Sequence, residues 1–380
     1  MTPKRLLAGL AAATTVAITS ACAPLEPADP FPRAALQAGL DELVETQAAS
    51  AAFLRVEEGE HEWSAAAGTV ERGSTVPVSA SSRFRIGSVT KTFVATVVLQ
   101  LVDQGRLALD DPIERHLPGV VPGGESITVR QVLGHTSGIY DYAHEPDRST
   151  NRWRGEARFR TYRPQELLDV AFATTPYFPP GQGWHYSNTN YVLAGLLVER
   201  LTGKPYGAAI AERILQPLHL NQTTVPGTDP AVPEPHAHGY AEVGGEFVDA
   251  TEMNPSLDWA AGEMISTAAD LNRFASALLG GELTSEASLA AMREPVGTPP
   301  GGLFRYGLGL QRFDLSCGVT VFGHGGELLG YLTYTMATAD GGRQLTLSYN
   351  PLRGVEGTDA TVIGIVSGSF CPAGDVRPAP

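Results

Sequence analysis

The hydrophobic and polar positions in the first third of the chain predict a helix, two strands and a second helix. Over residues 34–48, leucine and valine recur at intervals of three and four residues, which is typical of an amphipathic helix. Residues 51–56 and 63–69 are short, mainly hydrophobic runs separated by a charged turn, and they predict two strands. Residues 90–104 are hydrophobic on nearly every side of a helix, so we expect that helix to be buried.

From residue 111 onward, helical patterns come first and strand patterns follow. The region 111–255 combines helical segments, of which 193–201 is the clearest, with loops rich in proline and glycine. Four predicted strands and a closing helix follow, at 306–313, 319–323, 329–338, 344–349 and 361–370. This order predicts an α+β domain over 34–372, with one sheet built from 34–110 and 256–372 and the mostly helical region 111–255 inserted.

The first 22 residues have the features of an export signal. Lys4 and Arg5 precede thirteen uncharged residues, 6–18, and this hydrophobic stretch is too short to span a membrane permanently. We therefore predict that residues 1–22 direct export and that the protein works outside the cytoplasm, either anchored to the membrane or secreted.

Two cleavage patterns overlap at the end of this signal. Ser20-Ala21-Cys22 is typical of a lipoprotein signal, in which Cys22 carries the lipid, whereas Ala21-Cys22-Ala23 fits an ordinary signal peptidase. We favour lipidation of Cys22, which makes a lipid the only expected contact with the membrane. Residues 23–33 hold four prolines and predict an extended tether between this anchor and the domain.

The composition excludes several classes of protein. Hydrophobic residues make up 43% of the chain and charged residues 18%, which is ordinary for a folded globular protein and excludes a fibrous or disordered one. With 27 basic and 41 acidic residues, the formal net charge is −14. Sequence-independent nucleic-acid binding needs a cationic surface, so we expect no nucleic-acid partner.

The cysteines and histidines predict a disulfide and no metal site. Apart from Cys22, the chain has the even pair Cys317 and Cys371, and export favours a bridge between them over two buried thiols. His236 and His238 lie in a proline-rich stretch without a third ligand nearby, which favours a loop over a metal site. The chain has no P-loop motif, and we expect no cofactor.

Ser88 and Lys91 are the first candidate catalytic residues. They begin the buried helix in the order Ser-x-x-Lys, and residues three apart share one face of a helix. Backbone N–H groups at a helix N-terminus can stabilise an oxyanion, and a buried lysine with a lowered pKa can act as a base. A serine that only caps the helix is the alternative, but a lone lysine in a helix that otherwise rejects charge needs a partner or a function.

Two further motifs offer polar groups that such a serine needs. Tyr186 and Asn188 form a Tyr-x-Asn triplet behind a Pro-Gly turn. A tyrosine beside an ammonium group gives up its proton more easily and can act as a base, and an asparagine can bind a substrate amide. His324-Gly325-Gly326 follows the strand predicted at 319–323, where adjacent glycines let a substrate lie along the strand edge. Taken singly, each motif fits an ordinary turn or strand end.

In this order the three motifs resemble the Ser-x-x-Lys series of serine β-lactamases and penicillin-binding proteins. The Tyr-x-Asn triplet resembles class C β-lactamases and low-molecular-mass D-alanyl-D-alanine carboxypeptidases, in which histidine is also familiar in the third motif. The resemblance covers about residues 36–371 and implies a β-lactamase/transpeptidase-like fold, with an antiparallel sheet flanked by helices. Further runs resemble the same family: 84–87, 109–113, 133–138 and 266–271.

The resemblance implies a role for each candidate residue. Ser88 would attack a carbonyl carbon and form an acyl-enzyme, while Tyr186, coupled to Lys91, would pass the proton to the leaving group and later activate water. The backbone N–H groups of Ser88 and Glu327 would form the oxyanion hole. The remaining candidates would bind the substrate, complete the polar network or line the cleft: Asn188, His324, Gly325 and Trp259.

Three positions depart from the carboxypeptidase pattern. Gly325 stands where such peptidases usually have threonine, and Glu327 stands where a hydroxyl is expected. Gln311 stands where an arginine is expected, although Arg312 is adjacent. These enzymes need hydroxyl or cationic groups for the terminal carboxylate of the substrate, whereas a carboxylate at Glu327 would repel it. These departures weaken the carboxypeptidase prediction and favour, as the alternative, an esterase or another amidase with the same fold.

We predict an exported, penicillin-recognising serine hydrolase that resembles a D-alanyl-D-alanine carboxypeptidase and acts on peptidoglycan stem peptides. One alternative is an esterase or amidase of the β-lactamase fold with a small ester or amide substrate. The other is a non-catalytic, cell-wall-binding lipoprotein, although a pure binding protein has no need of a nucleophile with its base. We expect β-lactams to acylate Ser88 as inhibitors.

An arginine cluster is not explained by this prediction. Six arginines lie within sixteen residues of an otherwise acidic chain: Arg148, Arg152, Arg154, Arg158, Arg160 and Arg163. A solvated face is the interpretation that we favour. The alternative is a patch at the edge of the cleft that attracts an anionic polymer or a lipid head group.

Overall fold

The structure is a computed structural model that describes residues 29–149, 151–298 and 302–372. The predicted export signal, Cys22 and most of the predicted tether lie outside these residues. Where the tether is described, the prediction is wrong. Phe31 is buried in the hydrophobic core, its ring lies 5.6 Å from the guanidinium of Arg343, and the first helix begins at Arg33. A large aromatic side chain beside the sheet is more stable buried than exposed.

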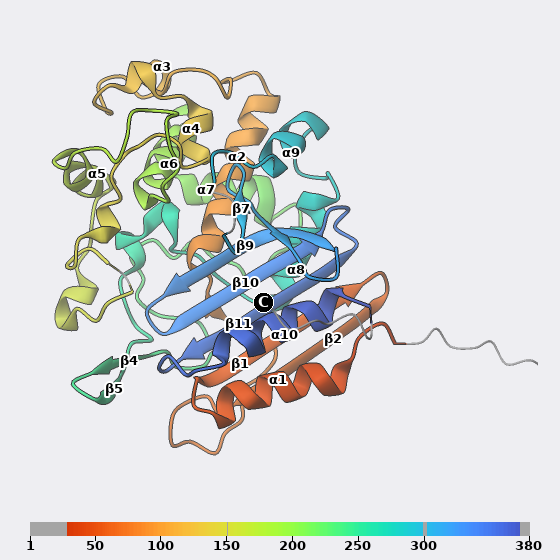
Figure 1. The fold of residues 1–380 in the computed structure, drawn as a ribbon. Helices are drawn as coiled ribbons and strands as arrows, with labels where there is room; N and C mark the ends of the chain where they lie inside the picture. Colours follow the sequence, from red (N-terminus) through yellow and green to blue (C-terminus); the bar gives the residue numbers. More distant parts are fainter. Residues whose placement is uncertain (1–28, 150, 299–301, 373–380) are drawn as a thin grey trace, which may run out of the picture.

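A seven-stranded antiparallel sheet forms the centre of the protein (Figure 1). Its strands follow the order β2-β1-β11-β10-β9-β8-β7, so the two N-terminal strands lie beside the C-terminal ones. This order confirms the predicted α+β fold with one sheet built from both ends of the chain. The strands are β1 (Ala49–Glu58), β2 (His61–Gly68), β7 (Arg305–Tyr306), β8 (Gln311–Asp314), β9 (Thr320–Leu328), β10 (Tyr331–Thr338) and β11 (Arg343–Pro351).

Two helices from opposite ends of the chain cover one face of the sheet (Figure 1). They are α1 (Arg33–Glu45) and α10 (Thr358–Phe370), and they also pack against each other. α1 buries Leu36, Leu40 and Leu43, which is the stripe that its spacing predicts. The two helices and the sheet enclose a hydrophobic cluster of their own, separate from the larger cluster on the opposite face.

The opposite face of the sheet carries the buried helix predicted from the sequence. In α2 (Thr90–Asp103), eleven of fourteen residues are buried. α6 (Asn188–Thr202) packs against α2, and α8 (Ala268–Leu279) packs on β10 and β11. The remaining helices are α3 (Ile113–His116), α4 (Val129–Leu133), α5 (Pro164–Phe172), α7 (Tyr206–Ile210) and α9 (Glu286–Arg293).

Two small strand pairs accompany the main sheet. β4 (Tyr240–Val243) and β5 (Glu246–Asp249) form a hairpin inside the inserted region, which the sequence patterns did not predict. β3 (Phe84–Arg85) pairs with β6 (Ile265–Ser266) immediately before the turn that carries Ser88. The second pair therefore ties the segment before Ser88 to residues that follow 180 to 182 positions later in the chain.

Two predicted strands differ from the observed ones. The strand expected at 306–313 is two short strands, β7 and β8, because the chain turns at Gly309, which has a φ of 72° and lies against α2. The strand expected at 319–323 continues to Leu328, so His324-Gly325-Gly326 lies inside β9 rather than at a strand end. An added Cβ at Gly323 would lie 1.9 Å from the carbonyl oxygen of Thr335, so this glycine serves a close approach and does not end the strand.

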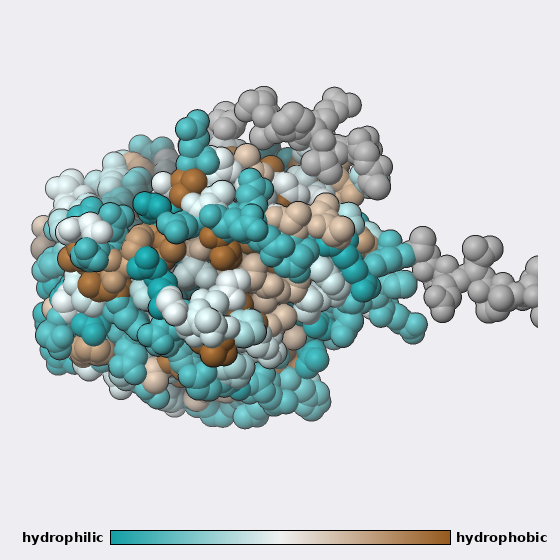
Figure 2. Space-filling view, turned by 90° about the horizontal axis from the view of Figure 1, so that it is seen from below, coloured by the Kyte–Doolittle hydropathy of each residue, from teal (hydrophilic) through white to brown (hydrophobic). Residues whose placement is uncertain are grey.

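Cys317 and Cys371 form a disulfide that joins the β8–β9 connection to the end of α10. A disulfide is typical of proteins that fold outside the cytoplasm. Among the helices of the described residues, none combines the length and the hydrophobicity that crossing a membrane requires. The face drawn in Figure 2 is mostly hydrophilic, and its hydrophobic residues form small separate areas.

Candidate active site

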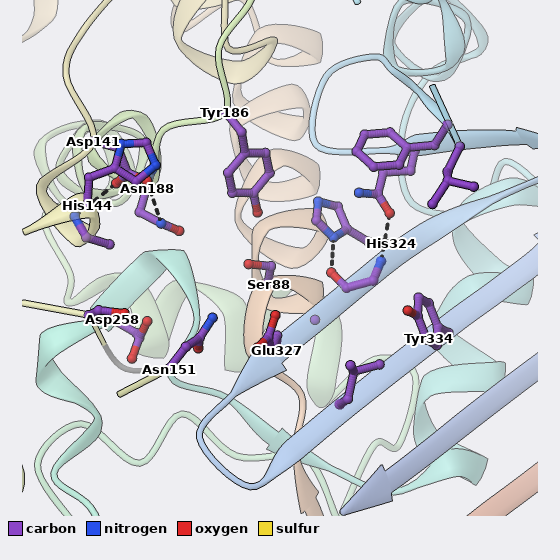
Figure 3. A pocket seen from close by; sticks show the side chains of 18 of the residues that line it. Ser88, Asp141, His144, Asn151, Tyr186, Asn188, Asp258, His324, Glu327 and Tyr334 are labelled. Carbon is purple, nitrogen blue, oxygen red and sulfur yellow. Dashed lines mark hydrogen bonds between the residues drawn. The ribbon is translucent and has the colours of Figure 1, made fainter. Parts of the chain in front are cut away.

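Ser88 lies where a short turn passes into the buried helix, and its side chain faces a pocket (Figure 3). The turn, η1 (Gly87–Val89), is 3-10 helical and continues directly into α2. Gly87 has a φ of 50°, and an added Cβ there would lie 2.7 Å from the backbone nitrogen of Glu327. Glycine therefore lets this turn lie directly against β9.

Gly326 provides the matching contact from β9. An added Cβ at Gly326 would lie 1.9 Å from the carbonyl oxygen of Ile86 and 2.9 Å from the backbone nitrogen of Ser88. The two glycines thus bring the backbones of Ser88 and Glu327 next to each other. An oxyanion hole formed by the N–H groups of these two residues requires this proximity.

Lys91 is fully buried one helical turn beyond Ser88. Its Nζ donates hydrogen bonds to Oγ of Ser88 (2.8 Å), Oδ1 of Asn188 (2.8 Å) and the carbonyl oxygen of Ala261 (2.7 Å). Burial lowers the pKa of Lys91 to about 7, although two nearby carboxylates act in the opposite direction. A large fraction of Lys91 is therefore neutral near pH 7. The neutral amine has two N–H groups, enough for Asn188 and Ala261, and its lone pair can then accept the proton of Ser88.

Tyr186 directs its hydroxyl group toward Ser88 (Figure 3). Its ring lies 4.9 Å from Nζ of Lys91 and stacks on the buried His135 ring at 4.3 Å. Burial raises the pKa of Tyr186 well above its usual value, and hydrogen bonding with Ser88 offsets only part of this effect. The direction is opposite to our expectation that the ammonium turns Tyr186 into a base, because loss of hydration disfavours the phenolate and the nearby carboxylates add to the effect. At neutral pH, Tyr186 is therefore a proton donor.

Asp141, which the sequence motifs did not single out, holds Asn188 in place. Nδ2 of Asn188 donates to Oδ2 of Asp141 at 3.1 Å, and the backbone N–H of Asn188 donates to Oδ1 at 3.0 Å. These bonds leave Oδ1 of Asn188 directed to Lys91. The two residues are 47 positions apart, so no local spacing links them. The position of Asp141 between two tyrosines was its only signal in the sequence.

His324 is buried inside β9 and is neutral. Its Nε2 shares a hydrogen bond with the hydroxyl of Tyr306 at 2.9 Å. Burial lowers the pKa of His324 to about 3, and the charge of Lys91 adds to the effect. A neutral imidazole offers hydrogen bonding but no positive charge for a substrate carboxylate.

Gln311 and Arg312 show what replaces the expected arginine on β8. Oε1 of Gln311 accepts a hydrogen bond from the backbone N–H of Gly325 at 2.8 Å, so this side chain supports β9. Arg312 pairs with Asp314 at 2.9 Å and does not contribute to the pocket lining. Neither residue places a cation beside the third motif.

A cavity of about 560 Å³ opens beside Ser88 (Figure 3). Its wall includes six residues that the sequence singled out: Ser88, Tyr186, Asn188, His324, Gly325 and Glu327. Glu327 is exposed at this wall, and partial loss of hydration raises its pKa. Hydrophobic side chains form another part of the wall: Leu303, Phe304, Phe313 and Leu332.

Trp259 does not line this cavity, and the prediction that it does is wrong. Its neighbour Asp258 lines the catalytic pocket, whereas Trp259 lines a different cavity. The backbone at Trp259 has a φ of 41°, in the left-handed region that non-glycine residues rarely occupy. The indole ring packs edge-on against Tyr206, with ring centroids 4.8 Å apart.

The arginine cluster is largely engaged with its own neighbours. Arg160 and Arg163 both pair with Glu166, and Arg148 pairs with Asp147. The ring of Tyr162 lies near three guanidinium groups, those of Arg148, Arg154 and Arg160. Of the described arginines, Arg152 lines the catalytic cavity.

The described ranges contain no group of three or more His, Cys, Asp and Glu side chains placed to hold a metal ion. The rings of His236 and His238 stack 5.5 Å apart, and Nδ1 of His238 bonds to Asp249 at 2.6 Å. These histidines thus take part in local packing and hydrogen bonding.

Two of the solved structures with a similar fold are named as enzymes that act on amides. The chain is 42% identical to a D-stereospecific amidohydrolase from Streptomyces sp., with a TM-score of 0.82 over 89% of this chain and 98% of the other. It is 30% identical to D-amino acid amidase from Ochrobactrum anthropi SV3, with a TM-score of 0.77 over 88% and 97% of the two chains.

Sequence comparison places the chain in a family. A penicillin-binding protein of Bacillus subtilis (strain 168) is 29% identical over 286 residues, and the match spans 72% of this chain but only 62% of that protein. The family model described as Beta-lactamase matches residues 34–364, which is most of the chain. The protein therefore belongs to the β-lactamase family, which is related to serine β-lactamases and penicillin-binding proteins.

Proposed function

We propose that the protein is an exported serine amidohydrolase that cleaves amides of D-amino acids through an acyl-enzyme on Ser88. One observation carries the proposal. Ser88, hydrogen-bonded to the buried Lys91, faces a pocket in which Glu327 stands where a carboxypeptidase needs a group that attracts a carboxylate. The names of the two similar structures support the same substrate class. The Cys317–Cys371 disulfide supports a place outside the cytoplasm.

In the acylation step, Oγ of Ser88 attacks the carbonyl carbon of the amide and Lys91 accepts the serine proton. The 2.8 Å hydrogen bond between them and the lowered pKa of Lys91 support this assignment. The backbone N–H groups of Ser88 and Glu327 stabilise the oxyanion. Tyr186 donates its proton to the departing amine as the C–N bond breaks, and the Lys91 ammonium then restores the phenol.

In the deacylation step, water replaces the amine at the same position. Neutral Lys91, acting directly or through Tyr186, removes a proton from this water as it attacks the acyl carbon. The Oγ of Ser88 leaves and regains a proton, and the free amino acid is released. Asn188, held by Asp141, keeps Lys91 in place throughout this cycle.

Glu327 gives the proposal its substrate preference. A D-amino acid amide carries a positive α-ammonium group, which the carboxylate of Glu327 attracts, and it carries no carboxylate for the pocket to repel. The hydrophobic part of the wall suits the side chain of such a substrate. A D-Ala-D-Ala peptide has the reverse charge at its reacting end.

The proposal is tested by measuring ammonia release from D-phenylalaninamide and L-phenylalaninamide, beside D-alanine release from N-acetyl-D-alanyl-D-alanine. We expect the D-amide to react faster than the other two, and the reaction to disappear in Ser88→Ala. Ser79→Ala, which removes an exposed serine outside the pocket, is the matched control and keeps full activity. Release of D-alanine without hydrolysis of either amide would instead establish a carboxypeptidase.

A further inference from the structure

A second cavity, of about 510 Å³, is lined by Trp259, the residue that follows Asp258 of the catalytic pocket. Asp258 immediately precedes the turn η7 (Trp259–Ala261). Asp258 lines the catalytic pocket, whereas Trp259 lines the second cavity together with Tyr206 and Glu263. Nothing in the proposed reaction uses this second cavity.

Glu263 presents an unusual carboxyl group to the second cavity. The residue is 1% exposed, and one carboxyl oxygen accepts a hydrogen bond from the hydroxyl of Tyr206. The other oxygen, Oε2, makes no hydrogen bond of ordinary geometry with the described residues, although the backbone of Gly227 stabilises the charged form of the carboxyl. Burial raises the pKa of Glu263 to about 8. A buried polar group without a partner is costly, and such groups are normally satisfied by protein, water or ligand.

The lining of this cavity is acidic and aromatic. Glu199 is a second carboxylate in the wall, and the described lining residues include no Lys, Arg or His. The rings of Trp259 and Tyr206 meet edge-on at 4.8 Å in this wall, and aromatic rings are side chains that attract a cation to their faces. The rest of the wall is mainly hydrophobic: Pro205, Ala208, Ala211, Leu215 and Val225. A positive group attached to a hydrophobic body fits this combination.

The backbone around the cavity is irregular at two places. Trp259 adopts a φ of 41°, in a region that non-glycine residues rarely occupy. Residues Ala211–Leu215 form a π-helical turn, and two of them line the cavity. Both kinds of irregularity concentrate at functional sites.

We propose that this cavity binds a small organic ammonium ion, with its positive group on Glu263 and its hydrophobic body against Trp259. The site is separate from Ser88 and does not depend on the reaction proposed there. Its occupant touches the turn whose Ala261 carbonyl accepts a hydrogen bond from Lys91 at 2.7 Å. A ligand in this cavity therefore lies beside the backbone that positions the catalytic lysine.

Calorimetric titration with benzylammonium chloride at about pH 8.5 tests the proposal, because Glu263 is then largely ionised and the probe still carries its charge. The titration uses the Glu327→Gln protein, so that the carboxylate at the catalytic pocket does not bind the probe. We expect one binding event in this protein. Adding Glu263→Gln should weaken the binding about ten-fold or more, because the variant keeps the size of the side chain but removes its charge. Benzyl alcohol, which has the same ring without the charge, should bind far more weakly.

A second variant covers the case in which Glu263→Gln does not fold. Val225→Phe leaves Glu263 unchanged and instead fills the hydrophobic part of the cavity with a larger side chain. It should also abolish the binding event. The proposal is overturned if benzylammonium binds equally well with Glu263→Gln or Val225→Phe in place, or if benzyl alcohol binds as tightly as benzylammonium. The binding measured here does not depend on the proposed reaction, so it would be unaffected if the protein failed to hydrolyse amides at Ser88.

Discussion

Lys91 and Tyr186 contact the same serine, and burial acts on their pKa values in opposite directions. Burial disfavours the charged form of each group, so it lowers the pKa of Lys91 to about 7 and raises the pKa of Tyr186. Near pH 7, Lys91 can therefore accept a proton while Tyr186 retains one. A base and an acid beside Ser88 then exist together in the free enzyme, as acylation of an amide requires.

The pKa of Lys91 predicts how activity depends on pH. The active form is neutral Lys91, whose fraction rises as the pH passes through about 7. With an uncharged substrate such as p-nitrophenyl acetate, kcat/KM should rise between pH 6 and pH 8, being about ten-fold below its plateau at pH 6. Lys91→Arg, which stays protonated, should lose acylation. A profile that is flat across this range would contradict the assignment of Lys91 as the base.

Glu327→Gln tests the substrate preference at the level of one residue. The change keeps the backbone N–H and the size of the side chain but removes its charge. KM for D-phenylalaninamide should rise about three- to ten-fold, whereas kcat/KM for uncharged p-nitrophenyl acetate should stay unchanged. Steady-state kinetics on both substrates measure this difference. If Glu327→Gln changed the kinetic constants of the charged and the uncharged substrate equally, Glu327 would not bind the ammonium group.

For single residues, the sequence identified the side chains of the proposed reaction but not the side chains that hold them in place. Ser88, Lys91, Tyr186 and Asn188 could be selected because each belongs to a short motif. Asp141 could not, since its contact with Asn188 arises only when a loop and a helix start meet. Trp259 was assigned to the wrong cavity because no residue pattern indicates that its side chain packs against Tyr206 while its neighbour Asp258 lines the pocket beside Ser88.

At the scale of elements, two glycines let the serine turn and β9 lie in direct contact. Gly87 in η1 faces the backbone of Glu327, and Gly326 in β9 faces the backbone of Ile86 and Ser88. Side chains at either position would separate the two elements. The spacing between Ser88 and the N–H of Glu327 is thus set by backbone contact and not by side-chain packing.

Gly326→Ala should disrupt this contact. Its Cβ would lie 1.9 Å from the carbonyl oxygen of Ile86, so β9 and η1 must move apart, and a shift of about 1 Å at a catalytic site costs about a hundred-fold in rate. Acylation by p-nitrophenyl acetate measures this loss. Gly364→Ala in α10 is the matched control, because an added Cβ there meets nothing within 4 Å. The control should keep its activity and gain up to about 1 kcal/mol of stability.

The predicted elements were most accurate where a long periodic pattern stands alone. α1 and α2 lie close to the ranges 34–48 and 90–104, because each depends on one repeating face or on continuous burial. The β7–β8 interruption and the extension of β9 to Leu328 were missed. In both, glycine packs against a neighbouring backbone, and the sequence alone does not distinguish this use from a turn.

At the scale of the whole molecule, the sheet separates two hydrophobic clusters that serve different purposes. The larger cluster surrounds α2 and supports Ser88 and Lys91. The smaller one holds α1 and α10 against the opposite face, where the Cys317–Cys371 disulfide fastens the end of α10. The disulfide residues are not among those that line the catalytic cavity.

Removing the disulfide should therefore lower stability without changing the chemistry. The bridge closes a loop with a sequence separation of 54, and a bridge of this kind typically contributes about 2–4 kcal/mol. Cys317→Ser with Cys371→Ser should lower the midpoint of urea unfolding while kcat of the folded protein is kept. An unchanged midpoint would mean that α10 is held by its hydrophobic contacts alone.

The sequence by itself determined the family and the α+β order of elements, because these depend on short motifs and on local periodicity, and it singled out Ser88 and Lys91 as candidate catalytic residues. It also indicated a single disulfide through the count of cysteines. The tertiary structure decided the directions in which burial moves the pKa values of Lys91 and Tyr186, and which residues support Asn188 and β9. It alone revealed the second cavity at Glu263, which forms between segments far apart in the chain.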